Sequence, residues 1–350
     1  MMLKTAQNLA KLRRTPPPVG QTPHSVVHQE NKWRLLRFEP KVQRYRTPIL
    51  MIPSMINRWY VLDLMPGRSL TEWLTQQGHE VYIVDWGKPT DEDRHLRFDD
   101  VVGRYLRRAL RRSAKASQVE KVHVLGYCMG GTLAAIHAAV YPERFASLTA
   151  LAAPVAFDDD GLLGVWTRSN ALDIDAFLRA FGNAPWPILQ ASFQLLKPTL
   201  NLSKWVFLVD RAVLDRAWDD PFLNGFFAKE RWANDNVSLP GELFRTWVQD
   251  IYQGDALRAG ALRLDGRAVD LAQICAPLHA ITFEDDYIVP KSTAQPLLEL
   301  TSSKDTTATH LRGGHVGAVV SQSASKRLWP ILQQWWADRD GARALTLSAS

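Results

Sequence analysis

The sequence predicts an α/β fold with a mostly parallel sheet, helices on both faces of that sheet, and an inserted, mainly helical cap. Short apolar runs alternate with segments of helical spacing over residues 31–157 and again over 273–345. Between these parts, residues 158–260 are rich in Trp, Phe and Leu and lack clear strand signals. The chain therefore divides into a basic N-terminal segment (1–30), a core in two parts, and a cap (158–272).

The first half of the core contains short apolar runs bounded by turn residues, the pattern of strands buried on both faces. The predicted strands are 33–38, 47–55, 79–87, 121–128 and 147–154. The predicted helices are 69–78, 99–116 and 130–142. The first of these helices closes on Gly78, a typical C-terminal signal.

The second half of the core supplies two more strands and a closing helix. The strands are predicted over 276–286 and 307–315, and the helix over 324–339. Pro330 interrupts this helix, because proline lacks a backbone N–H. In the cap, four tryptophans are expected to pack in the cap's own core: Trp186, Trp205, Trp218 and Trp232.

Composition and charge limit the classes of partner. The chain has 350 residues and a formal net charge of +6, which favours anionic partners such as nucleic acid, an acidic surface or a phosphate-bearing compound. No nucleic-acid-binding motif accompanies the charge, so nucleic-acid binding is not expected. The arginine-rich stretch 106–115 is expected to be the solvated face of a helix.

Cysteine content and hydropathy indicate the compartment. Cys128 and Cys275 are the only cysteines, which excludes a disulfide framework and a cysteine-based zinc site, and no metal is expected. So few cysteines suit a reducing cytoplasm. Residues 1–20 are basic, lack the apolar stretch of a signal peptide, and are expected to form a disordered tail. With no window apolar enough to span a bilayer, the sequence predicts a soluble cytoplasmic protein.

The stretch Gly126-Tyr-Cys128-Met-Gly130 lies between a predicted strand and a predicted helix. This is the context of the nucleophile elbow of α/β hydrolases, in which a sharp turn flanked by glycines exposes the central side chain. Cysteine replaces the usual serine here, and the helix N-terminus would favour its thiolate. The alternative is a buried cysteine that behaves as a small apolar side chain.

A nucleophile of this type needs a histidine base and an acid, which follow it in the chain in that scaffold. Of nine histidines, His315 follows the last predicted strand on a glycine-rich loop, RGGHVG. The preceding strand ends in Glu284, Asp285 and Asp286. Asp286 is preferred as the acid and Asp285 is the alternative, although an acidic cluster at a strand end is often only a solvated loop.

Several stretches together resemble the polyhydroxyalkanoate (poly-3-hydroxybutyrate) synthase family of the α/β-hydrolase superfamily. These stretches are GYCMGGT around Cys128, IPSMINRWYVLDLMPGRSL (52–70), YIVDWGKP (82–89), EDDYIVP and GGHVG. The resemblance runs from about Leu50 to about His315, and the length of the chain is similar to the short synthases that work with a second subunit.

The resemblance implies roles for five residues. Cys128 would carry the acyl group, and Asp286 and His315 would be its partners, the match of Asp286 resting on the Tyr-Ile-Val-Pro stretch that follows it. The oxyanion donors would be the backbone N–H groups of Met129 and Ile56. Ser54 departs from the double proline common in the family, so the geometry of the second donor is the weaker inference.

The implied activity is an acyltransferase that polymerises (R)-3-hydroxyacyl-CoA into polyhydroxyalkanoate and releases coenzyme A. A covalent thioester on the cysteine would be the intermediate, with a CoA thioester as substrate and no permanently bound cofactor. The implied partners are 3-hydroxyacyl-CoA, the growing polyester chain or granule, a second synthase subunit, and a second copy in a homodimer. The protein would then lie at the granule surface within the cytoplasm. As an alternative to forming a solvated helix face, the arginines of 106–115 would contact the phosphates of coenzyme A.

Two other functions remain open on the same residues. A thioesterase or polyester depolymerase would use the same scaffold and the same Cys-Asp-His set, because fold and triad do not determine the acceptor. A non-enzymatic family member that binds a granule or a synthase is disfavoured by the presence of all three side chains.

Overall fold

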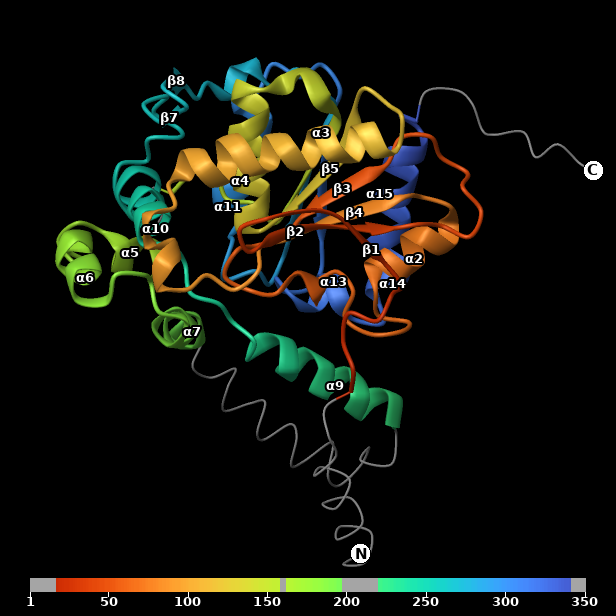
Figure 1. Ribbon diagram of the computed structural model, residues 1–350, viewed down its shortest axis with the longest axis horizontal. Helices are drawn as coiled ribbons and strands as arrows, with labels where there is room; N and C mark the ends of the chain where they lie inside the picture. Colours follow the sequence, from red (N-terminus) through yellow and green to blue (C-terminus); the bar gives the residue numbers. More distant parts are fainter. Residues whose placement is uncertain (1–16, 158–161, 197–219, 341–350) are drawn as a thin grey trace, which may run out of the picture.

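The computed structural model describes residues 17–157, 162–196 and 220–340. An eight-stranded sheet forms the centre of the molecule, with strand order β1-β2-β4-β3-β5-β6-β9-β10 (Figure 1). The strands are β1 (Ser25–Glu30), β2 (Trp33–Phe38), β3 (Ile49–Ile52), β4 (Val81–Asp85), β5 (Val122–Tyr127), β6 (Phe145–Leu151), β9 (Leu278–Phe283) and β10 (Thr306–Leu311). The first three in spatial order pair antiparallel, and all pairs from β4 to β10 are parallel. The predicted α/β fold is therefore confirmed.

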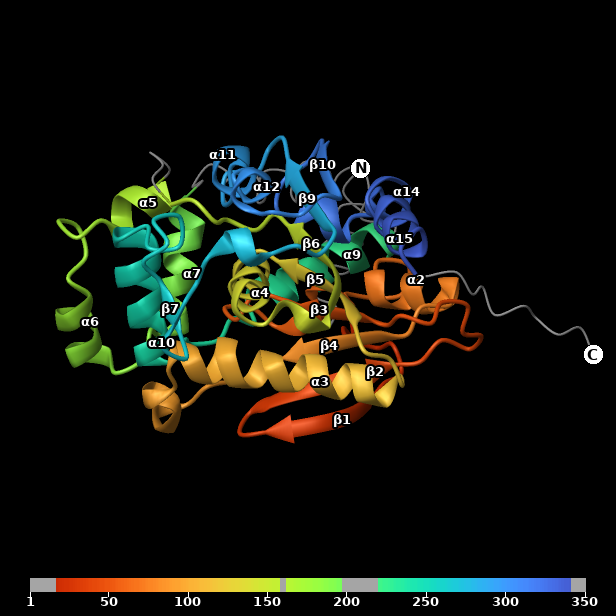
Figure 2. The same cartoon turned by 90° about the horizontal axis from the view of Figure 1, so that it is seen from above.

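Helices cover both faces of the sheet (Figure 2). The helices of the core are α2 (Leu70–Gln77), α3 (Leu106–Ala116), α4 (Met129–Val140), α11 (Lys291–Ala294), α12 (Leu297–Leu300), α13 (Gly317–Val320), α14 (Ala324–Arg327) and α15 (Trp329–Ala337). Successive residues of a strand pack in two different apolar clusters, one on each face of the sheet, because the side chains of a strand point to its two faces in turn. Leu50 packs in a cluster with α3 and α4, whereas Met51 packs in a cluster with α2 and α15.

The sheet begins earlier than the sequence predicts. The interpretation of 33–38 as the first strand is wrong, since β1 lies within residues 1–30 and pairs with β2 as a hairpin. The strand was missed because its sequence, SVVHQE, has few apolar residues and lies at an exposed edge of the sheet. The expected tail lies outside the described residues, except for 17–20.

Most of the described part of the predicted cap is helical. Its helices are α5 (Leu162–Thr167), α6 (Ile174–Phe181), α7 (Trp186–Leu195), α9 (Asp220–Ala233), α10 (Gly241–Thr246) and the π-helix η6 (Trp247–Gln253). A short hairpin of β7 (Arg263–Leu264) and β8 (Arg267–Ala268) follows. Trp232 is buried, but it packs in a cluster with residues of the α/β core such as Trp59, and Trp186 is 44% exposed, so the assignment of these two side chains to the cap's own core is wrong. Trp205 and Trp218 lie outside the described residues.

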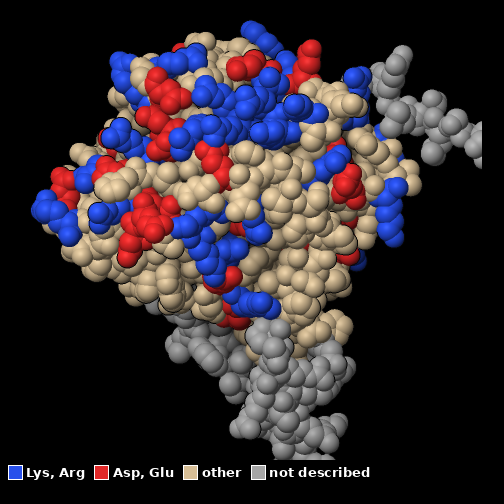
Figure 3. All heavy atoms as spheres, in the orientation of Figure 1, with Lys and Arg blue, Asp and Glu red and all other residues tan. Residues whose placement is uncertain are grey.

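Two further expectations concern helices of the core. The closing helix divides into α14 and α15, and Pro330 lies in the first turn of α15. A backbone N–H at this position would have no acceptor within the helix, so the proline costs no helical hydrogen bond. The arginine-rich stretch forms the outer face of α3, where Lys and Arg gather on the surface (Figure 3). Arg111 and Arg112 are exposed, and Arg108 forms an ion pair with Glu30. Within the described parts of the chain, no helix is long and apolar enough to cross a membrane.

Four histidines are buried in the core: His79, His123, His137 and His279. Burial lowers the pKa of His79 to about 3 and the pKa of the other three to about 4, because the charged imidazolium is poorly solvated inside the protein. These four side chains are therefore neutral in the folded protein at neutral pH.

We expect the buried histidines to make the protein acid-labile. Unfolded histidines bind protons at about pH 6.5, so the stabilisation is complete above that pH and is lost as the pH falls from about 6.5 toward about 4. At pH 5 the protonation of each histidine in the unfolded chain lowers the free energy of unfolding by about 2 kcal/mol relative to its value at neutral pH. In His137→Asn, the free energy of unfolding should depend less steeply on pH over this window, as measured by urea denaturation. His95→Asn, at an exposed position, should keep the wild-type slope; equal slopes in all three proteins would contradict this expectation.

Candidate active site

Cys128 occupies the sharp turn between β5 and α4, with φ 56° and ψ −130°. A positive φ is uncommon for a residue with a side chain and marks a strained turn. The neighbouring glycines permit it. A Cβ on Gly126 would lie 2.3 Å from the Cα of Gly131, and one on Gly130 would lie 2.0 Å from the carbonyl oxygen of Ile52. The turn therefore has the geometry that the glycine pattern predicts.

The backbone around Cys128 leaves a donor facing the site. The N–H of Cys128 donates to Leu151 O at 2.9 Å, and its carbonyl accepts from Gly131 N at 2.8 Å. Met129 is the first residue of α4, so its N–H has no acceptor within the helix. This N–H and the positive end of the helix dipole are available to a negative charge that develops next to the sulfur.

His315 and Asp286 lie together beside this turn. Asp286 Oδ2 accepts from His315 Nδ1 at 2.7 Å, and Oδ1 accepts from the N–H groups of Ile288 and Val289 at 3.0 and 2.8 Å. Both side chains are nearly inaccessible to solvent. His315 and Cys128 line the same small cavity, so the structure brings the three predicted side chains into one site.

The other acidic candidates point elsewhere. Asp285 and Glu284 are exposed, and Glu284 forms a surface ion pair with Arg312 at 3.6 Å. The N–H of Asp285 donates to Gly313 O at 3.0 Å. Of the three acidic residues at this strand end, Asp286 is the one whose carboxylate bonds His315.

The charges of the site determine the protonation of His315. Burial lowers the pKa of its imidazole, but the negative charges of Cys128 and Asp286 and the hydrogen bonds to both raise that pKa to about 10. His315 therefore holds its proton at neutral pH when Cys128 is a thiolate. An imidazolium next to a thiol stabilises the thiolate, which is the nucleophilic form.

The loop after β3 carries the second predicted oxyanion donor, Ile56. Its N–H donates to Ser54 Oγ at 3.3 Å, a long bond, and its carbonyl accepts from Val237 N at 2.9 Å. Ile56, Met129 and Cys128 line the same pocket. Ser54 is the residue that departs from the double proline described above. Its hydroxyl therefore contacts the Ile56 N–H.

The same loop is tied to residues 235–237, the segment that returns from α9 to α10 within the cap (the returning segment), an arrangement that sequence reasoning missed. Asn57 bridges to Asn236, with a short hydrogen bond between their side-chain amides. Tyr60 donates to Asp235 Oδ2 at 2.7 Å, and the exposed Lys88 pairs with Asp235 Oδ1 at 2.9 Å. These partners are between 147 and 179 residues apart, and no local pattern in the sequence identifies them.

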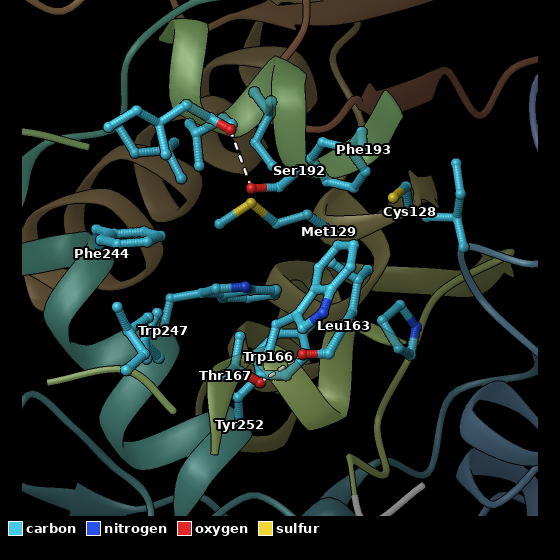
Figure 4. A pocket seen from close by; sticks show the side chains of 18 of the residues that line it. Cys128, Met129, Leu163, Trp166, Thr167, Ser192, Phe193, Phe244, Trp247 and Tyr252 are labelled. Carbon is cyan, nitrogen blue, oxygen red and sulfur yellow. Dashed lines mark hydrogen bonds between the residues drawn. The ribbon is translucent and has the colours of Figure 1, made fainter. Parts of the chain in front are cut away.

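Among the described residues, Cys128 lines both a larger and a smaller cavity. The larger has a volume of about 310 Å³ and lies mainly between the helices of the cap (Figure 4). The smaller is about 20 Å³, the size of one water, and is lined by polar side chains that include Ser54, Asn57 and Arg58. Among the described residues, no cluster of three or more His, Cys, Asp or Glu side chains is placed to hold a metal ion.

Comparisons with known proteins identify related sequences. The profile described as alpha/beta hydrolase fold matches residues 47–231, and the one described as poly-beta-hydroxybutyrate polymerase (PhaC) N-terminus matches residues 14–74. The chain is 37% identical to the poly(3-hydroxyalkanoate) polymerase subunit PhaC of Haloferax mediterranei, over 92% of this chain and 65% of that protein. It is 34% identical to the subunit of the same name from Allochromatium vinosum, over 91% of this chain and 90% of that one.

Solved structures extend the likeness of fold. A monoacylglycerol lipase of Paleococcus ferrophilus superposes with a TM-score of 0.52 at 15% identity, over 87% of this chain and 99% of that one. A putative non-heme bromoperoxidase, BpoC, of Mycobacterium tuberculosis superposes with a TM-score of 0.54 at 14% identity, over 89% of this chain and 98% of that one. At these identities the likeness shows the α/β-hydrolase fold alone.

We expect the reactivity of the Cys128 thiol to depend on His315 and Asp286. A free thiol with a pKa of about 8.5 is only a few per cent thiolate at pH 7. Loss of the imidazolium in His315→Asn should therefore slow alkylation by iodoacetamide at pH 7 by about tenfold or more. Asp286→Asn should slow it severalfold, because one of the interactions that raise the pKa of His315 is lost.

The matched control is Asp285→Asn, at the exposed neighbouring position. It should alkylate within about twofold of the wild-type rate, as followed by mass spectrometry of the labelled protein. Equal rates for Asp286→Asn and Asp285→Asn would move the acid role away from Asp286.

Proposed function

Because the chain belongs to the poly(3-hydroxyalkanoate) polymerase family, we propose that it polymerises (R)-3-hydroxyacyl-CoA through a thioester on Cys128 and releases coenzyme A. One observation carries the proposal: a cysteine at a nucleophile elbow lies beside an imidazole that is hydrogen-bonded to a buried carboxylate. The chain spans 65% of the length of the Haloferax relative, so substrate and partners are part of the proposal.

In the first step the thiolate of Cys128 attacks the thioester carbonyl of the substrate. A carbon–sulfur bond to Cys128 forms as the bond to coenzyme A breaks, and His315 gives its proton to the departing thiolate. One thioester replaces another, so the acyl group stays activated. Acylation also removes the charge of Cys128, one of the interactions that raise the pKa of His315, and so prepares the imidazole to act as a base.

In the second step a 3-hydroxyl group attacks the acyl thioester. His315 accepts the hydroxyl proton, an oxygen ester forms, and the thiolate of Cys128 is released. Asp286 holds the imidazole through Nδ1 and stabilises its charged form. Ester formation from a thioester is downhill, whereas a serine at this position would exchange one oxygen ester for another without a driving force.

The N–H groups of Met129 and Ile56 are the proposed oxyanion donors in both steps. Met129 N–H is free of helical acceptors, and Ile56 N–H makes only a 3.3 Å bond to Ser54 Oγ. The Ile56 carbonyl, which belongs to the peptide unit after the one that carries the Ile56 N–H, accepts from Val237 N, so the position of this loop depends on the returning segment of the cap.

A hydrolase remains the second candidate, because the cavity of about 20 Å³ beside Cys128 and His315 has room for one water. In a polymerase, the apolar cap excludes other water from the acyl enzyme. We further propose a second, non-catalytic subunit, a homodimer, and a location at the granule surface. The relatives carry the name of a polymerase subunit, which supports the first of these.

The decisive experiment is incubation with 3-hydroxyacyl-CoA, following thiol release and insoluble polyester together. Cys128→Ala should release no coenzyme A, because no acyl enzyme can form, while its melting temperature stays within a few degrees of the wild type. Cys128→Ser should form little polymer, since the drive for ester formation is lost. Coenzyme A release without polyester by the wild type would favour the hydrolase, and full activity of Cys128→Ala would refute the assignment of the nucleophile.

A second prediction tests the oxyanion loop through Asp235, which holds Tyr60. Asp235→Ala should lower acyl transfer by tenfold or more, because a displaced donor no longer meets the oxyanion. Alkylation of Cys128 by iodoacetamide forms no oxyanion and should change less than about twofold. Lys88→Met, which removes only the exposed ion pair, should leave both rates near the wild type. Equal loss of acylation and alkylation in Asp235→Ala would indicate general disruption and contradict the proposed role of the loop.

A further inference from the structure

The cavity beside Cys128 is large and apolar. Its volume is about 310 Å³, roughly twice that of an engineered apolar cavity that binds benzene. Its lining is mostly aliphatic and aromatic and includes Leu163, Trp166, Phe177, Leu189, Phe193 and Trp247. Figure 4 shows Cys128 at one side of the cavity and Phe244 and Trp247 at the opposite side. An acyl group attached to the sulfur therefore has an apolar space extending away from its carbonyl.

Two hydroxyl groups in the lining are already used within their own helices. Ser192 Oγ donates to Ile188 O at 2.9 Å, and Thr167 Oγ1 donates to Leu163 O at 2.7 Å. Their protons are not offered to an occupant. The lining also contains the Tyr252 hydroxyl and the indole N–H groups of Trp166 and Trp247, but apolar side chains form most of it. Burying an ester or amide against these apolar side chains would cost free energy, whereas burying an alkyl chain is favourable.

The parts of the substrate differ in how well they suit such a space. The pantetheine arm of coenzyme A carries amides, and a growing polyester carries an ester in every repeat. The alkyl side chain at C3 of the 3-hydroxyacyl group has no polar atom. In 3-hydroxybutyryl this side chain is a single methyl, which would leave most of the cavity empty.

We propose that this cavity receives the alkyl side chain of the acyl group, and that the enzyme prefers 3-hydroxyacyl groups with long side chains, such as 3-hydroxyoctanoyl, to 3-hydroxybutyryl. The inference rests on the proposed function and specifies its substrate class. Each buried methylene favours binding by about fourfold. Four additional methylenes should therefore raise the rate constant of acylation by at least about tenfold, even if only part of that gain is realised.

The test compares single-turnover coenzyme A release from 3-hydroxybutyryl-CoA and 3-hydroxyoctanoyl-CoA by the full chain. In the wild type the octanoyl substrate should react at least about tenfold faster at subsaturating concentration. Ser192→Phe would fill the middle of the cavity and should lower the octanoyl-to-butyryl ratio by about tenfold. Gln194→Phe introduces a phenylalanine on the exposed face of α7 and should leave the octanoyl-to-butyryl ratio unchanged.

A second variant guards against misfolding of the first. Phe244→Leu enlarges the far side of the cavity and should raise the ratio of 3-hydroxydodecanoyl-CoA to 3-hydroxyoctanoyl-CoA severalfold. A wild type that prefers the butyryl substrate, or a Ser192→Phe that slows both substrates equally, would overturn the inference and leave the proposed function standing. Equal slowing would assign the cavity to the pantetheine arm. If neither thioester releases coenzyme A from the wild type, the proposed function itself fails.

Discussion

The contact between the first turn of α4 and the end of β3 is the constraint on which the site depends. The Cα of Gly130 approaches the carbonyl of Ile52 so closely that no side chain fits between them. This approach fixes the strained turn at Cys128 and brings the N–H of Met129 and the loop that carries Ile56 to the same pocket. The proposed nucleophile and oxyanion donors are thus positioned by backbone packing, which changes little during a reaction.

The charges of the site come from the ends of three strands. Cys128 follows β5, Asp286 follows β9, and His315 follows β10. Because these strands are parallel, their carboxyl ends meet at one edge of the sheet, where an open α/β sheet binds its ligands. The proton affinity of His315 depends on both anionic neighbours, so the loss of one charge on acylation changes the behaviour of the imidazole. In the proposed reaction His315 would therefore serve as acid in one step and as base in the next.

The cap contributes to both specificity and chemistry. Its helices form most of the apolar cavity beside Cys128. Its returning segment bonds the loop after β3 through Asp235, Asn236 and Val237. A change in the cap is therefore expected to affect the position of the loop that carries Ile56 as well as the space available to substrate. Because of these bonds, the inserted cap would also support the loop after β3, in addition to excluding water from the site.

The sequence by itself determined the parallel sheet, the elbow around Cys128 and the identity of His315, because these depend on local periodicity, on glycines at fixed positions and on order along the chain. It left Asp285 as an alternative to Asp286, missed β1, and placed Trp186 in the cap core. Only the tertiary structure decided these points, since burial of a carboxylate, pairing of a polar edge strand and exposure of a tryptophan depend on what lies opposite. The bonds between the cap and the loop after β3, and the dimensions of the apolar cavity, likewise arise from residues far apart in the chain.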